Sequence, residues 1–196
     1  MDELMAARSL GTRPVVTLGG DTVALVRDTV FDDGAGWITG FTLSRPGLRS
    51  GPLKEGLPWA TVHALGHEAV MVRDRRCLVA LAVMTVRQES LRARLLGAAL
   101  RTEEGRDVGT VLDVVVEGGD SGRVVGFRVA AGRGSASGSR RRGRTVYVPR
   151  GESLAVAGRT LVVPGEAVRE TADDLAGLAV LVARARGASG GGRGAP

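Results

Sequence analysis

The two histidines are the first residues whose spacing could support chemistry. His63 and His67 lie four positions apart. On a helix that spacing would place both imidazoles on one face, where they could bind a metal ion. The surrounding residues favour a strand followed by a turn, so we expect two surface histidines. The sequence therefore predicts no metal site and no bound cofactor.

Cys77 is the only cysteine, which excludes an intrachain disulfide and any cysteine-rich metal cluster. Arg73, Arg75 and Arg76 precede it, and nearby cations favour a reactive thiolate. However, an apolar run follows the cysteine and no histidine is close in sequence. These neighbours indicate a half-buried structural thiol.

Asp28 and Asp113 occupy equivalent places in two similar stretches of the chain. A pair of carboxylates can perform acid–base catalysis, but equivalent places in separate domains are expected to lie far apart. We therefore assign both aspartates to structural roles, such as capping turns. No nucleophile, base and orienting group can be assembled from the sequence. We predict no catalytic residues and a protein that is not an enzyme.

The net charge is +6. Arginine accounts for nearly all of the positive charge, because Lys54 is the only lysine. The densest cluster is Arg140, Arg141, Arg142 and Arg144, at the end of a Gly- and Ser-rich stretch that is typical of a mobile loop. Such a loop attracts phosphates or acidic surfaces. These four arginines are the candidate anion- or partner-binding residues, and a solvated loop is the alternative.

The composition indicates a β-rich protein with an aliphatic core. Hydrophobic residues make up 43% of the 196 residues and aromatic residues only 3%, so Val, Leu and Ala must form the core. Glycines separate short valine-rich runs, as in strands joined by turns. The longest apolar stretch, Leu78 to Met84, is too short to span a bilayer. The N-terminal MDELMAARSL lacks the apolar core of a secretion signal, so we expect a cytoplasmic protein.

An internal repeat of five blocks in the same order is the strongest signal in the sequence. Within each copy the apolar residues alternate with period two, as in strands that bury one face. Turn residues recur every eight to twelve positions, which favours a meander that closes into a small antiparallel barrel. The matched pairs are Leu10-Gly11 with Leu96-Gly97, Val23–Asp28 with Val108–Asp113, turn 32–36 with turn 118–122, Ile38–Leu43 with Val124–Val129, and Leu57–Val72 with Val148–Val163.

The order of these motifs resembles the PRC-barrel domain. The shared features are a Leu-Gly start, a hairpin that ends in Val-X-Asp, a glycine turn, a strand with Gly-Phe and a late apolar-Pro strand. The second copy matches better, because the first has Ala24 in place of Gly109 and Leu18-Gly19-Gly20-Asp21 in place of an acidic-Gly hairpin. The resemblance implies small, mostly antiparallel β-barrels that serve as assembly modules. Examples are the cytoplasmic domain of the photosynthetic reaction-centre H subunit and the C-terminal domain of a ribosome-maturation factor.

We therefore predict an all-β protein with two small antiparallel PRC-like barrels in tandem and a C-terminal amphipathic helix. The apolar run Leu78 to Val86 in the linker is either a buried strand or a short helix. The C-terminal segment has apolar residues at helical spacing, and Thr171 is the expected N-cap. That helix docks either on a barrel or on a partner. The predicted boundaries are 8–75 for the first repeat, 76–94 for the linker, 95–165 for the second repeat, 166–187 for the helix and 188–196 for a disordered tail.

These features predict a non-catalytic protein–protein interaction or assembly adaptor with an unidentified protein partner. The alternative is a basic, nucleic-acid-associated factor for RNA or ribosome assembly that uses the arginine-rich loop. Only Tyr147 lies near that loop to stack on a base, which argues against sequence-specific or single-strand recognition.

Overall fold

The computed structural model describes residues 3–32, 34–47, 51–84, 95–132 and 144–190. The chain forms two compact units. Unit 1 comprises Met1–Leu96 and Asp113–Val124, and unit 2 comprises Gly97–Leu112 and Val125–Pro196. The hairpin arm 113–124 belongs to the second copy by sequence, but it is part of unit 1.

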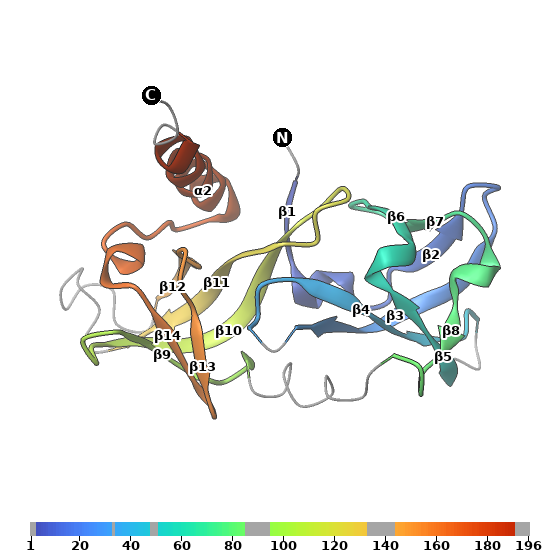
Figure 1. The fold of residues 1–196 in the computed structure, drawn as a ribbon, viewed down its shortest axis with the longest axis horizontal. Helices are drawn as coiled ribbons and strands as arrows, with labels where there is room; N and C mark the ends of the chain where they lie inside the picture. Colours follow the sequence, from blue (N-terminus) through green and yellow to red (C-terminus); the bar gives the residue numbers. More distant parts are fainter. Residues whose placement is uncertain (1–2, 33, 48–50, 85–94, 133–143, 191–196) are drawn as a thin grey trace, which may run out of the picture. The chain divides into compact units, whose positions relative to one another are not determined.

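The sheet of the first copy has the strand order β6-β7-β2-β3-β4-β5-β8 (Figure 1). The long strands β3 and β4 form its centre, and their buried residues include Phe31 and Phe41. The 3-10 turns η1 (Ala7–Leu10), η2 (Trp59–Thr61) and η3 (Arg75–Cys77) connect its strands. The strands are β2 (Pro14–Thr17), β3 (Thr22–Phe31), β4 (Ile38–Ser44), β5 (Pro52–Pro58), β6 (Val62–Leu65), β7 (Val70–Val72) and β8 (Val79–Ala80).

The sheet of the second copy has the order β12-β11-β10-β9-β14-β13, with β1 (Leu4–Ala6) paired to β10. The pairing with β1 involves the last residues of β10, Val115 to Glu117, which belong to unit 1. The strands of the second copy are β9 (Ala99–Thr102), β10 (Asp107–Glu117), β11 (Val124–Ala131), β12 (Thr145–Pro149), β13 (Ala155–Ala157) and β14 (Thr160–Val163).

The sheets are mixed, so the prediction of antiparallel barrels is wrong in this respect. β2 pairs parallel with β7, and β9 pairs parallel with β14. The turn signals predicted hairpins, which reverse the chain at every step. The connection through η2 is not a hairpin, because it carries the chain from β5 to β6 at the other end of the hydrogen-bonded order. The last strand of the copy therefore returns beside the first and runs in the same direction.

Each sheet is an open, curled half-barrel in the described part of the chain. The hydrogen-bonded order of the first copy ends at β6 and β8, which do not pair with each other among the described residues. The core is aliphatic, as the composition predicts, and all three phenylalanines are buried in it. The described backbone ladders therefore do not complete a ring in either copy.

The two copies share one turn despite their different sequences. In the first copy the Thr17 hydroxyl accepts the N–H of Asp21, and in the second the Thr102 hydroxyl accepts the N–H of Arg106. Gly20 and Gly105 both have a positive φ, of 91° and 79°. Such a φ favours glycine. The departure of Leu18-Gly19-Gly20-Asp21 from the family pattern therefore leaves the turn unchanged.

An α-helix, α2 (Leu175–Gly190), follows the second copy after the 3-10 turn η6 (Gly165–Val168). Asp174, rather than the predicted Thr171, caps it, because its carboxylate accepts the N–H of Gly177 at 2.7 Å. Leu178 is fully buried, whereas Val180 is 58% exposed. The helix thus docks on the sheet of unit 2 along a narrow face.

Candidate interaction surfaces

The predicted arginine cluster lies mostly outside the described residues, which do not include Arg140, Arg141 and Arg142. Arg144 is described and exposed, and its guanidinium lies 3.8 Å from a carboxylate oxygen of Asp173. An exposed pair of this kind contributes little to stability, about 0–1 kcal/mol.

The residues first considered for chemistry occupy separate places in unit 1. His63 is exposed on β6, and His67 Nδ1 lies 3.3 Å from Glu3 Oε1. Cys77 is half-buried at the end of η3. Asp113 is buried and accepts the N–H of Arg8, which lies in η1. In the ranges that the structure describes, no three His, Cys, Asp or Glu side chains are grouped to hold a metal ion.

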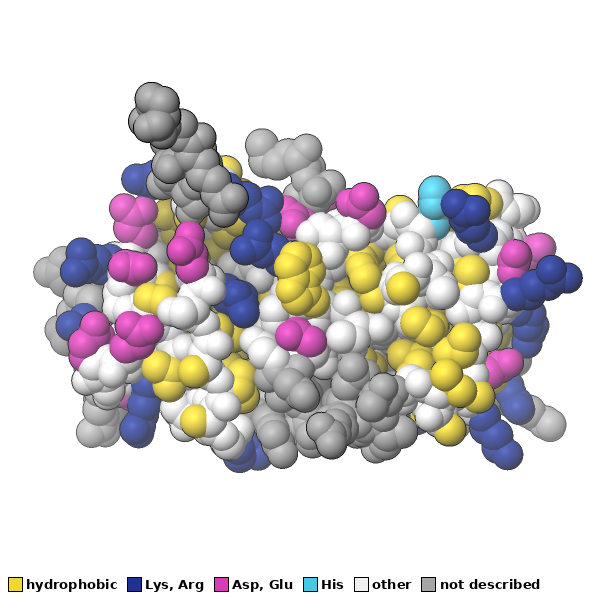
Figure 2. All heavy atoms as spheres, viewed as in Figure 1, with side chains coloured by type: hydrophobic (Ala, Val, Ile, Leu, Met, Phe, Trp, Pro, Cys, Tyr) yellow, Lys and Arg dark blue, Asp and Glu magenta, His cyan; other side chains and the backbone are white. Residues whose placement is uncertain are grey.

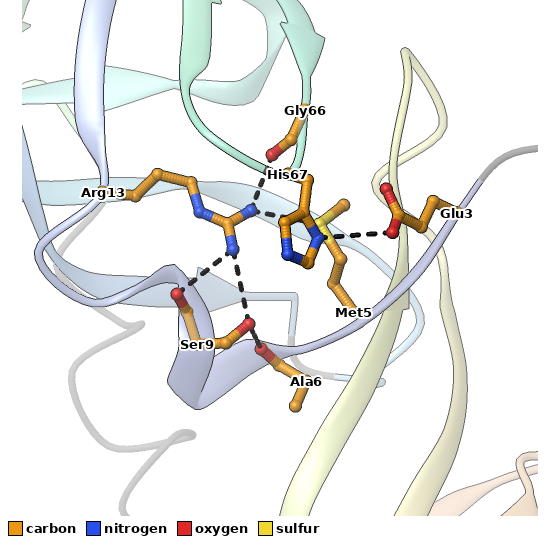
Figure 3. Close-up of polar contacts among 7 residues, drawn as sticks. All are labelled: Glu3, Met5, Ala6, Ser9, Arg13, Gly66 and His67. Carbon is orange, nitrogen blue, oxygen red and sulfur yellow. Dashed lines mark hydrogen bonds and ion pairs between the residues drawn. The ribbon is translucent and has the colours of Figure 1, made fainter. Parts of the chain in front are cut away.

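Arg13 is a buried arginine that the sequence arguments missed (Figure 3). It is 7% exposed, and its guanidinium donates to the carbonyl oxygens of Gly66 at 2.6 Å and Ser9 at 3.2 Å. Burial lowers the pKa of Arg13, and the carboxylates of Glu68 and Glu3 oppose that shift. The side chain stays charged, so it ties the η1 segment to the turn between β6 and β7. The signal in the sequence is an arginine where the second copy has Ala98.

Unit 2 has an open, charged pocket of about 580 Å³ beside η6. The Thr102 hydroxyl holds the pKa of Glu104 below its usual value by a hydrogen bond, and a backbone hydrogen bond, Arg106 and Arg169 act in the same direction. The lining residues are Glu103, Glu104, Arg106, Glu152, Ser153, Pro164, Gly165, Glu166 and Arg169. Acids and arginines are interleaved, so the pocket has neither a single sign of charge nor an apolar floor.

The most apolar run of the chain lies on the surface of unit 1. We call residues 78–84 the apolar strip. It contains the edge strand β8, which pairs with β5, followed by a turn in which the N–H of Val83 donates to Ala80. Val83 is 73% exposed. Figure 2 shows hydrophobic side chains gathered over β5 and β8.

Two glycines explain why the strip lies flat on the sheet. A Cβ atom at Gly40 would lie 2.5 Å from Met84 Cε, and a Cβ atom at Gly56 would collide with Met84 Sδ. Leu81 Cδ1 would lie 3.1 Å from that second Cβ atom. Met84 and Leu81 therefore pack directly on the backbone of β4 and β5, while Val83 faces solvent.

A second surface feature of unit 1 is an exposed tryptophan under an arginine. Trp37 is 50% exposed, and the guanidinium carbon of Arg123 lies 5.8 Å from its ring centroid. The separation is within the range of a cation–π interaction. Trp59 packs on Gly122, which directly precedes Arg123, and its ring centroid lies 6.1 Å from that of Phe41.

Comparison with known families agrees with this architecture. The family model of the PRC-barrel domain matches the chain twice, over residues 2–76 and 87–169. The chain therefore belongs to the PRC-barrel family and carries two of its domains in tandem. No curated protein matches the sequence. Within the described ranges, no helix combines the length and the hydropathy needed to cross a membrane.

Proposed function

We propose that this chain is a non-catalytic protein-interaction adaptor that acts in the cytoplasm. The observation that carries the proposal is the apolar strip 78–84, which stays on the surface of unit 1 with Val83 73% exposed. In this strip Ala80, Ala82 and Val83 are exposed, and its other residues are half-buried. Contiguous exposed apolar surface is typical of protein-interaction sites.

Membership of the PRC-barrel family supports an interaction role, because the resemblance implies assembly modules rather than enzymes. The edge position of β8 supports it as well. A short edge strand with apolar neighbours offers both unpaired backbone groups and side-chain contacts to a partner. The partner is accordingly a protein that presents an apolar segment.

Site-specific photo-crosslinking tests this proposal. A benzophenone amino acid at Val83 should capture a defined protein in extracts of the source cells, and capture should survive nuclease treatment. The matched control is the same probe at Leu18, another exposed aliphatic residue of unit 1 (55% exposed) that lies outside the strip. Equal capture at both positions, or none at Val83, would contradict the adaptor role of the strip.

Nucleic-acid binding is the second candidate, and the four clustered arginines favour it. The variant with Arg140, Arg141, Arg142 and Arg144 all changed to Gln separates the two functions. A nucleic-acid factor would lose salt-sensitive RNA or DNA recovery in this variant. An adaptor that uses the strip would keep its Val83 crosslink.

A further inference from the structure

Two equivalent turns of the repeat pair with each other inside unit 1. The turn before β4 and the turn before β11 form an antiparallel bridge at Trp37 and Arg123. The N–H of Ile38 donates to Gly122, and the N–H of Val124 donates to Gly36, both at 2.8 Å. All of these residues belong to unit 1.

The bridge joins corresponding positions of the two copies. Ile38 matches Val124 in the repeat, so Trp37 matches Arg123 and Gly36 matches Gly122. The two backbone hydrogen bonds are therefore equivalent to each other, as in a contact with local twofold symmetry. Such a contact sets each residue against its own counterpart.

The side chains at this bridge break that symmetry. The first copy supplies an aromatic ring and the second supplies a guanidinium, which stacks at 5.8 Å. Arg123 is half-buried, and its guanidinium lies over the ring of Trp37. A second tryptophan of the first copy is replaced by arginine in the second copy. Trp59, which packs on Gly122 next to the bridge, matches Arg150. Both tryptophans of the chain thus lie in the first copy, with arginines at the matching positions of the second.

We propose that Trp37 and Arg123 are the residues that direct the second-copy turn to the first-copy turn, because Arg123 gains a tryptophan partner there and would face its own charge in a pair of two second-copy turns. Two arginine-bearing turns would place like charges directly opposite each other, which is destabilising in paired strands. A tryptophan opposite an arginine gains a cation–π interaction instead. The second-copy turn is thereby excluded from pairing with its own equivalent in another chain and is directed to the first-copy turn.

A charge swap in the full-length protein tests this proposal through the unfolding equilibrium constant. Trp37→Arg sets two arginines opposite each other and should raise that constant about two- to fivefold or more, from the loss of the cation–π pair alone. The combined Trp37→Arg and Arg123→Trp variant restores an unlike pair and should recover most of the loss. A swap variant as unstable as Trp37→Arg would overturn the proposal.

A double-mutant cycle provides the second measurement and does not depend on the swapped side chains fitting. Trp37→Leu, Arg123→Met and their combination should show a coupling of about two- to fivefold in the unfolding equilibrium constant. Arg101→Met, at an exposed arginine on β9, is the control partner for Trp37→Leu and should show none. A cycle with no coupling between positions 37 and 123 would also overturn the proposal.

Discussion

Each sheet has a hollow over a glycine, Gly40 in the first copy and Gly126 in the second, and different elements fill the two hollows. In the first copy Gly40 lies against the Leu57 carbonyl and is covered by Met84 from the apolar strip. In the second copy the matching Gly126 lies against the Val148 carbonyl and is covered by Leu178 from α2. One cover is an extended surface strip and the other is a helix.

The comparison shows that the repeat specifies the hollow but not the element that fills it. The glycine and the neighbouring strand create a site where only an apolar side chain from outside the sheet can pack. Whatever apolar segment follows the copy supplies that side chain. The helix buries Leu178 completely, whereas the strip leaves Met84 half-buried and Val83 exposed. The covering side chain is therefore more accessible in the first copy than in the second.

Shortening the two covering side chains should have the largest effect on the free energy of unfolding. The size of the loss should differ between the helix cover and the strip cover. Leu178→Ala should lower the free energy of unfolding by about 2–3 kcal/mol, near the lower end for buried leucines because α2 can undock. Met84→Ala should cost less, about 1 kcal/mol, because that side chain is only half-buried. Urea denaturation gives both values, and hydrogen exchange should report loss of protection in α2 for Leu178→Ala only. Equal costs would contradict the difference between the covers.

Filling the hollow itself should affect both copies alike. A Cβ atom would lie 2.5 Å from the Leu57 carbonyl oxygen at Gly40, and 2.7 Å from the Val148 carbonyl oxygen at Gly126. We expect Gly40→Val and Gly126→Val each to cost about 1–3 kcal/mol in unfolding free energy. Gly51→Val is the control, because nothing lies within 4 Å of its Cβ position. An unchanged denaturation midpoint in either test variant would refute the equivalence.

Arg13 marks a place where the copies differ in polarity, since Ala98 takes its position in the second copy. Arg13→Met keeps the side-chain length but leaves the part-buried carbonyl oxygens of Gly66 and Ser9 without their donor. The expected loss is about 1–2 kcal/mol in unfolding free energy. Calorimetry checks this value, and Arg8→Met at an exposed arginine of η1 should leave stability unchanged.

The smallest expected effect is a change in the pKa of Glu104, which lies in the second copy. Thr102→Val removes the hydroxyl that lowers the pKa of Glu104, so that pKa should rise toward its usual value. A depressed folded-state pKa contributes stability above the unfolded-state pKa, and that contribution is lost as pH falls through the folded-state value. NMR titration of the Glu104 carboxyl measures the shift directly. Thr17→Val should cause no such change, because Gly19 stands at the matching position of the first copy.

The sequence by itself determined the repeat, the β-rich class and the family, because each depends on local patterns. Alternating apolar residues predict strands, and glycine at fixed places predicts turns such as those at Gly20 and Gly105. The C-terminal helix followed from apolar spacing in the same way.

Only the tertiary structure decided which distant segments meet. The parallel pairing of β2 with β7 follows from a connection that is not a hairpin, and no local pattern encodes it. The apolar strip gave no periodicity that separates strand from helix, so its surface position depended on the packing of Met84 against Gly40 and Gly56. The contact between Trp37 and Arg123 joins residues far apart in the chain. Such contacts depend on the summed packing of whole sheets, which short-range sequence patterns do not contain.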